Sequence, residues 1–253
     1  MAARHSIETS EHGGVRYLHF GSPWIQGAMR VARPFALELE YTREMMAALL
    51  LHPDPEWPES VLLVGLGAGS LAKFLYRHRP RATLHAVEIN PEVVTIAHSR
   101  FRLPAPDERF EIFTADAARW LPACPRRYDL ILVDGFDPRA RAGALERLPF
   151  YQSCQEHLTR QGLCVTNLFA GTRGYAGAVE RLREAFRGRV LAFPSCDTGN
   201  AVAFAASGEK ILWTLDELRT HALLLMQATR LNLQATLTRL EAAQTCPAGK
   251  LRL

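Results

Sequence analysis

The feature that most constrains the fold of this chain is the segment 61–90, in which apolar and polar stretches follow a set order. A short apolar stretch with β-branched residues comes first, and its length fits a buried parallel strand better than a helix. Three glycines, a helical stretch, a second apolar stretch and an acidic residue follow: Gly65, Gly67, Gly69, 71–79, 84–87 and Glu88. This order is typical of a unit that binds a nucleotide.

The parts of this unit have separable physical roles. A side chain at Gly65 or Gly67 would block the tight turn or keep a ligand away from the backbone. A helix that begins near Ser70 directs its free N–H groups at whatever occupies the turn. Glu88 lies about 20 residues farther on, where a carboxylate can accept hydrogen bonds from both ribose hydroxyls. The spacing G-x-G-x-G, rather than G-x-G-x-x-G, favours an adenosyl-sulfonium cofactor over a dinucleotide.

Predicted strands and helices alternate after residue 90. The strands are expected at 110–113, 128–133, 162–168, 189–193 and 200–205, and the helices at 91–101, 150–159 and 175–186. This alternation predicts an α/β fold with a doubly wound, mostly parallel sheet. Ligands of such sheets lie outside the carboxyl ends of the strands. Glu88, Asp116 and Asp134 each end a different predicted strand, so we expect them to converge on one crevice.

The chain is expected to comprise an N-terminal β-hairpin region, a Rossmann-like catalytic domain and a helical tail: 1–52, 61–207 and 208–253. Within the first region the pattern predicts a frayed end, a two-stranded hairpin and an amphipathic helix: 1–14, 15–30 and 34–51. The proline-rich stretch 52–58 marks the expected boundary. Leucine spacing in 215–243 predicts a helix that packs on the rest of the chain or on another subunit.

Composition argues against several functional classes. The 253 residues suffice for one large domain with an appendage, and a net charge of +4 is too small to indicate nucleic-acid binding. Five scattered cysteines without a C-x-x-C pair predict a reducing compartment, and nine histidines without ligand spacing predict no metal site. The polar N-terminus and the absence of an apolar run of about 20 residues predict a cytoplasmic protein that does not enter the membrane.

Four segments, VLLVGLGAG, AVEINPEVV, TADAARWL and YDLILVDGFDP, together resemble the spermidine synthase family, the polyamine aminopropyltransferases. The first three are also shared with class I methyltransferases, so the resemblance implies a class I methyltransferase-like fold. The D-x-x-D-P loop that begins at Asp134 favours the aminopropyltransferases. The resemblance covers residues 24–207.

The resemblance implies a set of cofactor contacts. The three glycines of the turn would cradle the sulfonium side of decarboxylated S-adenosylmethionine or S-adenosylmethionine, which serves as co-substrate. Glu88 would bind the ribose, and Asp116 with the backbone of Ala117 would bind the amino edge of the adenine. Gln26 falls where family members place a glutamine that faces the reacting groups.

The resemblance also implies catalytic residues. Asp134 would orient and deprotonate the attacking amine, Asp137 would stand in the loop over the substrate, and Tyr41 would face the reacting groups. A free alkylamine has a pKa near 10, so it must lose a proton as it attacks the carbon bonded to sulfur. A carboxylate in contact with the ammonium can take that proton.

The sequence departs from the family pattern at several positions. Family members usually carry an aspartate where this chain has Ala68, and that aspartate grips the amino end of decarboxylated S-adenosylmethionine. Its replacement removes one reason to prefer the decarboxylated form. Thr42 replaces the usual histidine, and Arg139 and Arg141 place two cations where a polyamine would enter.

The leading hypothesis is therefore aminopropyl transfer from decarboxylated S-adenosylmethionine to a polyamine such as putrescine. The alternatives are an S-adenosylmethionine-dependent methyltransferase acting on a small molecule, which Ala68 favours, and a catalytically inactive nucleotide-binding homologue. The N/D-P-P-F/Y tetrapeptide of nucleic-acid amino-methylases is absent, so no nucleic-acid partner is expected. The family implies a homodimer or homotetramer.

Overall fold

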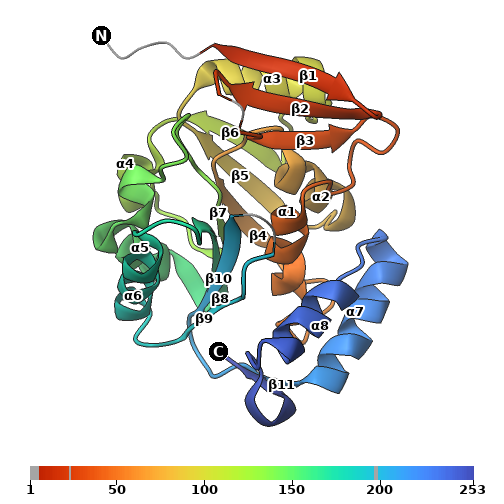
Figure 1. Ribbon diagram of the computed structural model, residues 1–253. Coiled ribbons are helices and arrows are strands. Elements are labelled where there is room, and N and C mark those ends of the chain that lie inside the picture. The colour runs from red at the N-terminus through yellow and green to blue at the C-terminus, as the bar shows by residue number, and fades with distance from the viewer. Residues whose placement is uncertain (1–5, 23, 197–198) are drawn as a thin grey trace.

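The computed structural model describes residues 6–22, 24–196 and 199–253, and its centre is a seven-stranded sheet (Figure 1). The strands in spatial order are β6 (Phe110–Thr114), β5 (Thr83–Glu88), β4 (Ser60–Val64), β7 (Tyr128–Val133), β8 (Leu158–Phe169), β10 (Asn200–Ala206) and β9 (Val190–Ala192). Strands β4 to β8 run parallel, and β10 is antiparallel to both neighbours. The predicted doubly wound, mostly parallel sheet is confirmed.

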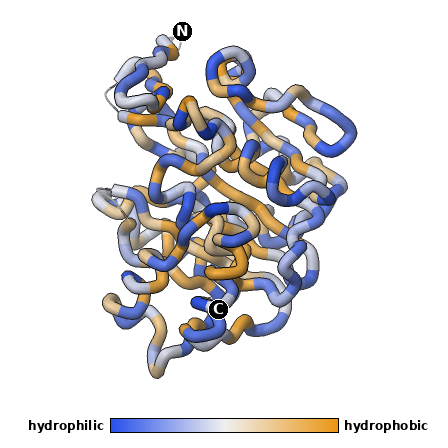
Figure 2. The backbone as a smooth tube through the Cα atoms, turned by 90° about the vertical axis from the view of Figure 1, so that its right-hand side faces the viewer, coloured by the Kyte–Doolittle hydropathy of each residue, from blue (hydrophilic) through white to orange (hydrophobic). Residues whose placement is uncertain are grey.

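Helices cover both faces of this sheet, which explains why its strands are apolar along their length. One layer contains α1 (Glu40–Met45), η1 (Met46–Leu50), α2 (Ser70–His78) and α3 (Pro91–Phe101). The other contains α4 (Ala117–Trp120), η2 (Leu121–Ala123), η3 (Gly143–Glu146), α5 (Leu148–Glu156) and α6 (Tyr175–Ala185). Within β4, Leu63 packs into the first layer, and Leu62 and Val64 pack into the second. In Figure 2 apolar segments run through the middle of the molecule.

The N-terminal region forms a separate antiparallel sheet of β1 (Ile7–His12), β2 (Val15–Phe20) and β3 (Gly27–Arg30). The expected hairpin is present as β2 and β3. The expectation of a frayed end is wrong for 7–12, which pairs with β2 through the two-residue turn Gly13-Gly14. Both glycines have positive φ, the conformation that such a hairpin turn requires. Residues 1–5 lie outside the described part.

Two predicted helices are shorter in the structure. The helix expected at 34–51 begins only at Glu40, because the Arg43 guanidinium bonds the carbonyl oxygens of Leu37 and Glu38 and holds the preceding segment in an irregular path. The helix expected at 150–159 ends at Glu156, because Leu158 already pairs with Tyr128 in the sheet.

The C-terminal tail consists of β11 (Leu212–Thr214), α7 (Leu215–Thr229), α8 (Gln234–Ala242), η4 (Pro247–Gly249) and β12 (Lys250–Arg252). The helical spacing in 215–243 thus corresponds to two helices, with a break after Arg230, whose φ is positive. Both helices pack on the layer that contains α1 and η1, at the lower right of Figure 1. The structure therefore shows that the tail packs on the chain itself, and contact with another subunit stays a prediction.

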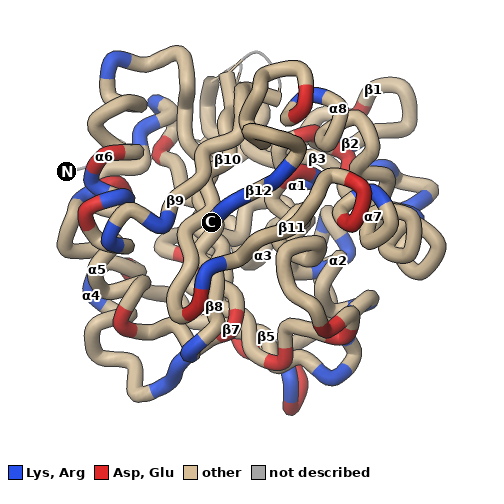
Figure 3. Tube along the Cα trace, turned by 90° about the horizontal axis from the view of Figure 1, so that it is seen from below, with Lys and Arg blue, Asp and Glu red and all other residues tan. Residues whose placement is uncertain are grey.

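Charges and other surface features complete the description. Figure 3 shows basic and acidic positions interspersed around the molecule. Within the described ranges, no helix has the length and apolar character needed to cross a membrane. No cluster of three or more His, Cys, Asp or Glu side chains suited to a metal ion occurs among those same residues.

Candidate active site

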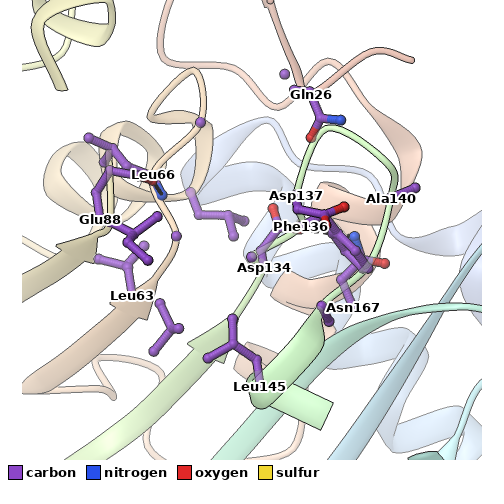
Figure 4. Close-up of a pocket in the computed structure, with 18 of the residues that line it drawn as sticks. Gln26, Leu63, Leu66, Glu88, Asp134, Phe136, Asp137, Ala140, Leu145 and Asn167 are labelled. Atoms are coloured by element: carbon purple, nitrogen blue, oxygen red, sulfur yellow. Dashed lines mark hydrogen bonds between the residues drawn. The ribbon is translucent and has the colours of Figure 1, made fainter. Parts of the chain in front are cut away.

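A cavity of about 550 Å³ opens at the carboxyl ends of the parallel strands, where the strand order reverses between β4 and β7. Nine of the candidate residues line it: Gln26, Tyr41, Gly65, Gly67, Glu88, Asp116, Ala117, Asp134 and Asp137. Gly69 does not line the cavity and lies against the side chain of Leu103. In Figure 4, Glu88 and Leu66 lie on one side, which we call the turn side. Asp134, Phe136 and Asp137 lie opposite, on the loop side.

The glycine turn after β4 brings backbone to the cavity wall. Gly65 and Gly67 have φ values of +88° and +50°, which residues with a side chain rarely adopt. A Cβ at Gly65 would collide with the carbonyl oxygen of Asp134, and one at Gly67 would lie 3.0 Å from the carbonyl oxygen of Gln26. Both positions therefore require glycine, and the turn leaves its backbone open to a ligand.

Glu88 ends β5 and is 7% exposed. Its Oε2 accepts a hydrogen bond from the Leu66 N–H at 2.9 Å, and its Oε1 accepts one from the Asn90 N–H at 2.9 Å. Burial raises the pKa of this carboxyl, and the backbone N–H groups act in the opposite direction. Glu88 thus ties the glycine turn to the end of β5 while it forms part of the cavity wall.

Asp116 follows β6 and caps the short helix α4. Its Oδ1 accepts a hydrogen bond from the Ala118 N–H at 3.0 Å, and its Oδ2 lies 3.8 Å from Nε of Arg119. Ala117 beside it is buried, whereas Ile89 on the same cavity wall is 69% exposed. A carboxylate and an exposed apolar side chain suit the polar edge and the flat face of a nucleobase.

Asp134 follows β7 and is held by two side chains from other elements. Its Oδ2 accepts a hydrogen bond from the Tyr41 hydroxyl at 3.2 Å, and its Oδ1 accepts one from Nδ2 of Asn167 at 2.9 Å. Burial raises the pKa of this carboxyl, and both hydrogen bonds oppose that effect. An oriented carboxylate with a raised pKa is suited to take a proton from an amine.

Asn167 is a site residue that the sequence analysis missed. It lies near the end of β8, is 4% exposed, and lines the cavity. Its Oδ1 has no hydrogen-bond partner among the described residues. The available signal was a polar residue inside an apolar strand, because a buried amide requires partners. That signal does not say which side chain the amide meets.

Asp137 occupies the loop after β7 and is bound by its own loop. Its Oδ2 accepts hydrogen bonds from Nε and Nη2 of Arg141 at 2.9 and 2.7 Å. Its Oδ1 accepts the backbone N–H groups of Arg139 and Arg141 at 2.8 and 3.0 Å. Burial alone would raise the pKa of Asp137, but these hydrogen bonds and the charge of Arg141 hold it below its usual range.

Aromatic side chains complete the wall beyond Asp134. The rings of Trp24 and Phe136 each meet the ring of Phe169 edge-on, with centroids 5.6 and 6.4 Å apart. All three residues line the cavity, and Trp24 is 53% exposed. Aromatic faces bind both apolar chains and cations.

Sequence comparison relates the chain to proteins that act on polyamines. Residues 39–168 match the spermine/spermidine synthase domain. A polyamine aminopropyltransferase of Neisseria meningitidis serogroup A is 37% identical over 237 residues, which are 94% of this chain and 89% of the relative. A polyamine aminopropyltransferase of Chromobacterium violaceum is 38% identical over 222 residues, which are 88% of this chain and 84% of the relative.

Solved structures share the fold. A probable spermidine synthase from Corynebacterium glutamicum has a TM-score of 0.72 at 20% identity, over 87% of this chain and 83% of that one. Human methyltransferase-like protein 13, solved in complex with SAH, has a TM-score of 0.68 at 25% identity, over 76% of this chain and 93% of that one. The fold is therefore the Rossmann-like fold that methyltransferases and spermidine synthases share.

Proposed function

This chain belongs to the spermine/spermidine synthase family, and from that premise we propose that it transfers an aminopropyl group from decarboxylated S-adenosylmethionine to a small amine. The observation that carries the proposal is the environment of Asp134. This carboxylate is oriented by Tyr41 and Asn167 in the same cavity that Glu88 and Asp116 line. The proposed base, Asp134, therefore lies in the same cavity as the residues proposed to bind the nucleotide, Glu88 and Asp116.

The residues present fit the co-substrate. On the turn side, Glu88 would bind the ribose, the glycine backbone would lie along the sulfonium side, and Asp116 with Ala117 would bind the adenine. On the loop side, Tyr41 and Gln26 would face the reacting groups. These roles are supported by the cavity that the residues share and by the absence of side chains at Gly65 and Gly67.

The chemistry that the chain would perform is a displacement. The amine nitrogen forms a bond to the methylene carbon attached to S⁺, the carbon–sulfur bond breaks, and its electron pair leaves with sulfur as neutral methylthioadenosine. The proton released by the amine passes to an oxygen of Asp134. The carboxylate, which Tyr41 and Asn167 orient, acts as general base, and alignment of the reacting atoms supplies much of the remaining acceleration.

We expect Asp134→Asn to slow this reaction strongly. The amide keeps the size of the side chain and removes the proton acceptor, so kcat should fall by about 100-fold or more. The loss of kcat would be measured from the rate of methylthioadenosine formation with decarboxylated S-adenosylmethionine and either putrescine or n-butylamine. Calorimetry with decarboxylated S-adenosylmethionine, S-adenosylmethionine and methylthioadenosine would show that the variant still binds nucleotide. Full activity in the variant, or no binding of any of these nucleotides by the wild type, would contradict the proposal.

A second candidate is methyl transfer from S-adenosylmethionine to a small molecule. The observation that favours it is Ala68, a buried residue of the glycine turn with no charge to bind an amino group or to repel a carboxylate. Tighter binding of S-adenosylmethionine than of its decarboxylated form, together with SAH release, would identify this activity. A chain that binds nucleotide and turns over neither substrate would be the inactive homologue.

We also propose a cellular compartment and an oligomeric state for the protein. Free thiols at Cys124, Cys154, Cys164 and Cys246 support a reducing, cytoplasmic compartment. A homodimer or homotetramer and the lack of a nucleic-acid partner remain predictions. Light scattering after gel filtration and a nucleic-acid mobility shift assay would test them.

A further inference from the structure

Asn167 lies where an apolar face of β8 ends. Side chains alternate between the two faces of a strand, and Leu163 and Val165 pack into the layer that contains α1. Asn167 is the next residue on that face, and its neighbour in β10, Val202, packs into the same layer. An apolar side chain at residue 167 would continue this packing. Instead the chain places a buried amide there, at the wall of the cavity.

The two ends of this amide differ in their hydrogen bonding. Nδ2 donates to Oδ1 of Asp134 at 2.9 Å, whereas the amide oxygen of Asn167 has no partner among the described residues. An ionised carboxylate only accepts hydrogen bonds, so the NH2 end of the amide must face Asp134. Figure 4 shows Asn167 on the same side of the cavity as Asp134. Buried polar atoms are nearly always hydrogen-bonded, so an unpaired oxygen at a cavity wall indicates a ligand that donates.

A primary ammonium group is the donor that suits both residues. Among the described residues, Asp134 accepts two hydrogen bonds, both from neutral side chains. About two of the four lone-pair positions of its carboxylate therefore remain for a ligand. The amide oxygen of Asn167 adds a neutral acceptor beside them. An ammonium group has three N–H donors, so one nitrogen can bond both the carboxylate and the amide oxygen.

We propose that Asn167 binds the attacking amine through its amide oxygen and fixes the direction of the nitrogen lone pair. This inference rests on the proposed function and adds a substrate contact to it. The acceptor ammonium would donate one N–H to Asp134 and one to Asn167.

The transfer step then runs between fixed atoms. The first proton passes to an oxygen of Asp134, and the nitrogen lone pair that it leaves forms the bond to the methylene carbon. The carbon–sulfur bond breaks, its electron pair stays with sulfur in neutral methylthioadenosine, and the positive charge moves from sulfur to nitrogen. Because the second N–H remains bonded to Asn167, the lone pair stays directed at the carbon.

Two substitutions separate the two ends of the amide. Asn167→Asp keeps an acceptor oxygen and loses the donor to Asp134, whereas Asn167→Leu loses both. Calorimetry with methylthioadenosine bound would measure putrescine binding at about pH 8.5, above the usual pKa range of carboxyls and below that of alkylamines. The matched control is Tyr151→Phe, because it removes another buried oxygen that has no partner among the described residues but lies outside the cavity.

We expect Asn167→Leu to weaken putrescine binding by about tenfold or more, the effect of losing a hydrogen bond to a charged group. Asn167→Asp should bind putrescine at least as tightly as the wild type, because its oxygen carries charge. Tyr151→Phe should change the affinity by about twofold or less. Equal weakening in Asn167→Asp and Asn167→Leu would limit residue 167 to a donor for Asp134 and overturn the inference. Unchanged binding in Asn167→Leu would also overturn it.

Folding and turnover are measured separately. Melting temperatures and methylthioadenosine binding show whether each variant folds, and Asn167→Ala serves in place of Asn167→Leu if the larger side chain prevents folding. Putrescine that binds as expected but yields no methylthioadenosine from decarboxylated S-adenosylmethionine would contradict the proposed function and support the amine contact. Turnover of putrescine with the same kcat/KM in the wild type and Asn167→Leu would overturn the inference alone.

Discussion

The carboxylate of Asp134 is held by two side chains that come from distant parts of the chain. Tyr41 of α1 and Asn167 of β8 each bond one oxygen of Asp134. Both are neutral donors, so they orient the carboxylate and leave it able to accept a proton. Burial raises the pKa of Asp134, and these two hydrogen bonds oppose burial. Two residues that lie 93 and 33 positions away from Asp134 thus moderate the effect of burial on the pKa of the proposed base.

The substitution Tyr41→Phe removes one of those hydrogen bonds. The pKa of Asp134 then rises further, so the carboxyl stays protonated to a higher pH. We expect the acid limb of kcat/KM against pH to move to higher pH, and kcat/KM at neutral pH to fall by about tenfold. The matched control is Tyr76→Phe, which removes a hydroxyl bonded to Asp107 at 2.7 Å outside the cavity. Coincident pH profiles for wild type and Tyr41→Phe would contradict this view.

At the scale of elements, α1 links the C-terminal tail to the cavity. The helix contributes Tyr41 to the cavity wall and the fully buried Glu44 to an ion pair with Arg239 of α8, whose side chain is 22% exposed. Arg239 also lies 3.6 Å from Oε1 of Glu40. A buried carboxylate requires a paired cation, so α8 constrains the position of α1. Tail residues themselves are not among those that line the cavity.

Arg239→Met tests this link. It leaves Glu44 buried without its partner, which should cost about 3 kcal/mol of unfolding free energy. If α1 shifts, the acid limb of the pH profile should move in the same direction as in Tyr41→Phe. The double variant with Glu44→Gln should regain stability, and Arg219→Met, which breaks exposed pairs with Asp216 and Glu241, should have little effect. If Arg239→Met is less stable but has an unchanged pH profile, the tail stabilises the fold without influencing Asp134.

At the scale of the whole molecule, the tail and one face of the sheet share a single apolar core. Leu218 and Leu240 belong to the same cluster as Val61 and Leu132 of the central strands. Hydrogen bonds reinforce this packing, since Nε1 of Trp213 donates to the carbonyl oxygen of Leu51 at 3.1 Å. We therefore expect the tail to unfold together with the sheet. The boundaries expected at 1–52, 61–207 and 208–253 remain predictions about how the chain is organised.

The substitution Leu240→Ala measures how much the tail contributes to this core. Leu240 is fully buried, so the cavity left by its truncation should lower the unfolding free energy by about 2–5 kcal/mol. Leu224→Ala on α7 is the matched control, because that side chain is 57% exposed and should cost about 0.5 kcal/mol or less. Urea unfolding followed by circular dichroism would compare them. Equal losses for the two variants would refute the shared core.

Prediction succeeded where the signal was local. The helix expected at 91–101 agrees with α3 at both ends, and 128–133 agrees with β7. Periodicity and end signals act over a few residues, and the sheet buries both faces of its strands, so the patterns were clear. The N-terminal strand was missed although Gly13-Gly14 is a hairpin signal, because the polar residues of 7–12 lack an apolar alternation.

The sequence by itself determined that a buried strand leads into a glycine turn, and that Glu88, Asp116 and Asp134 each follow a different strand of a parallel sheet. Both follow from short-range patterns and from the rule that such strands end at one edge of the sheet. Only the tertiary structure decided that Asn167 meets Asp134, that Arg141 saturates Asp137, and that Arg239 holds α1. The physical reason is that a polar side chain can form hydrogen bonds or ion pairs with many different groups. The packing of distant segments decides which of these groups becomes its partner.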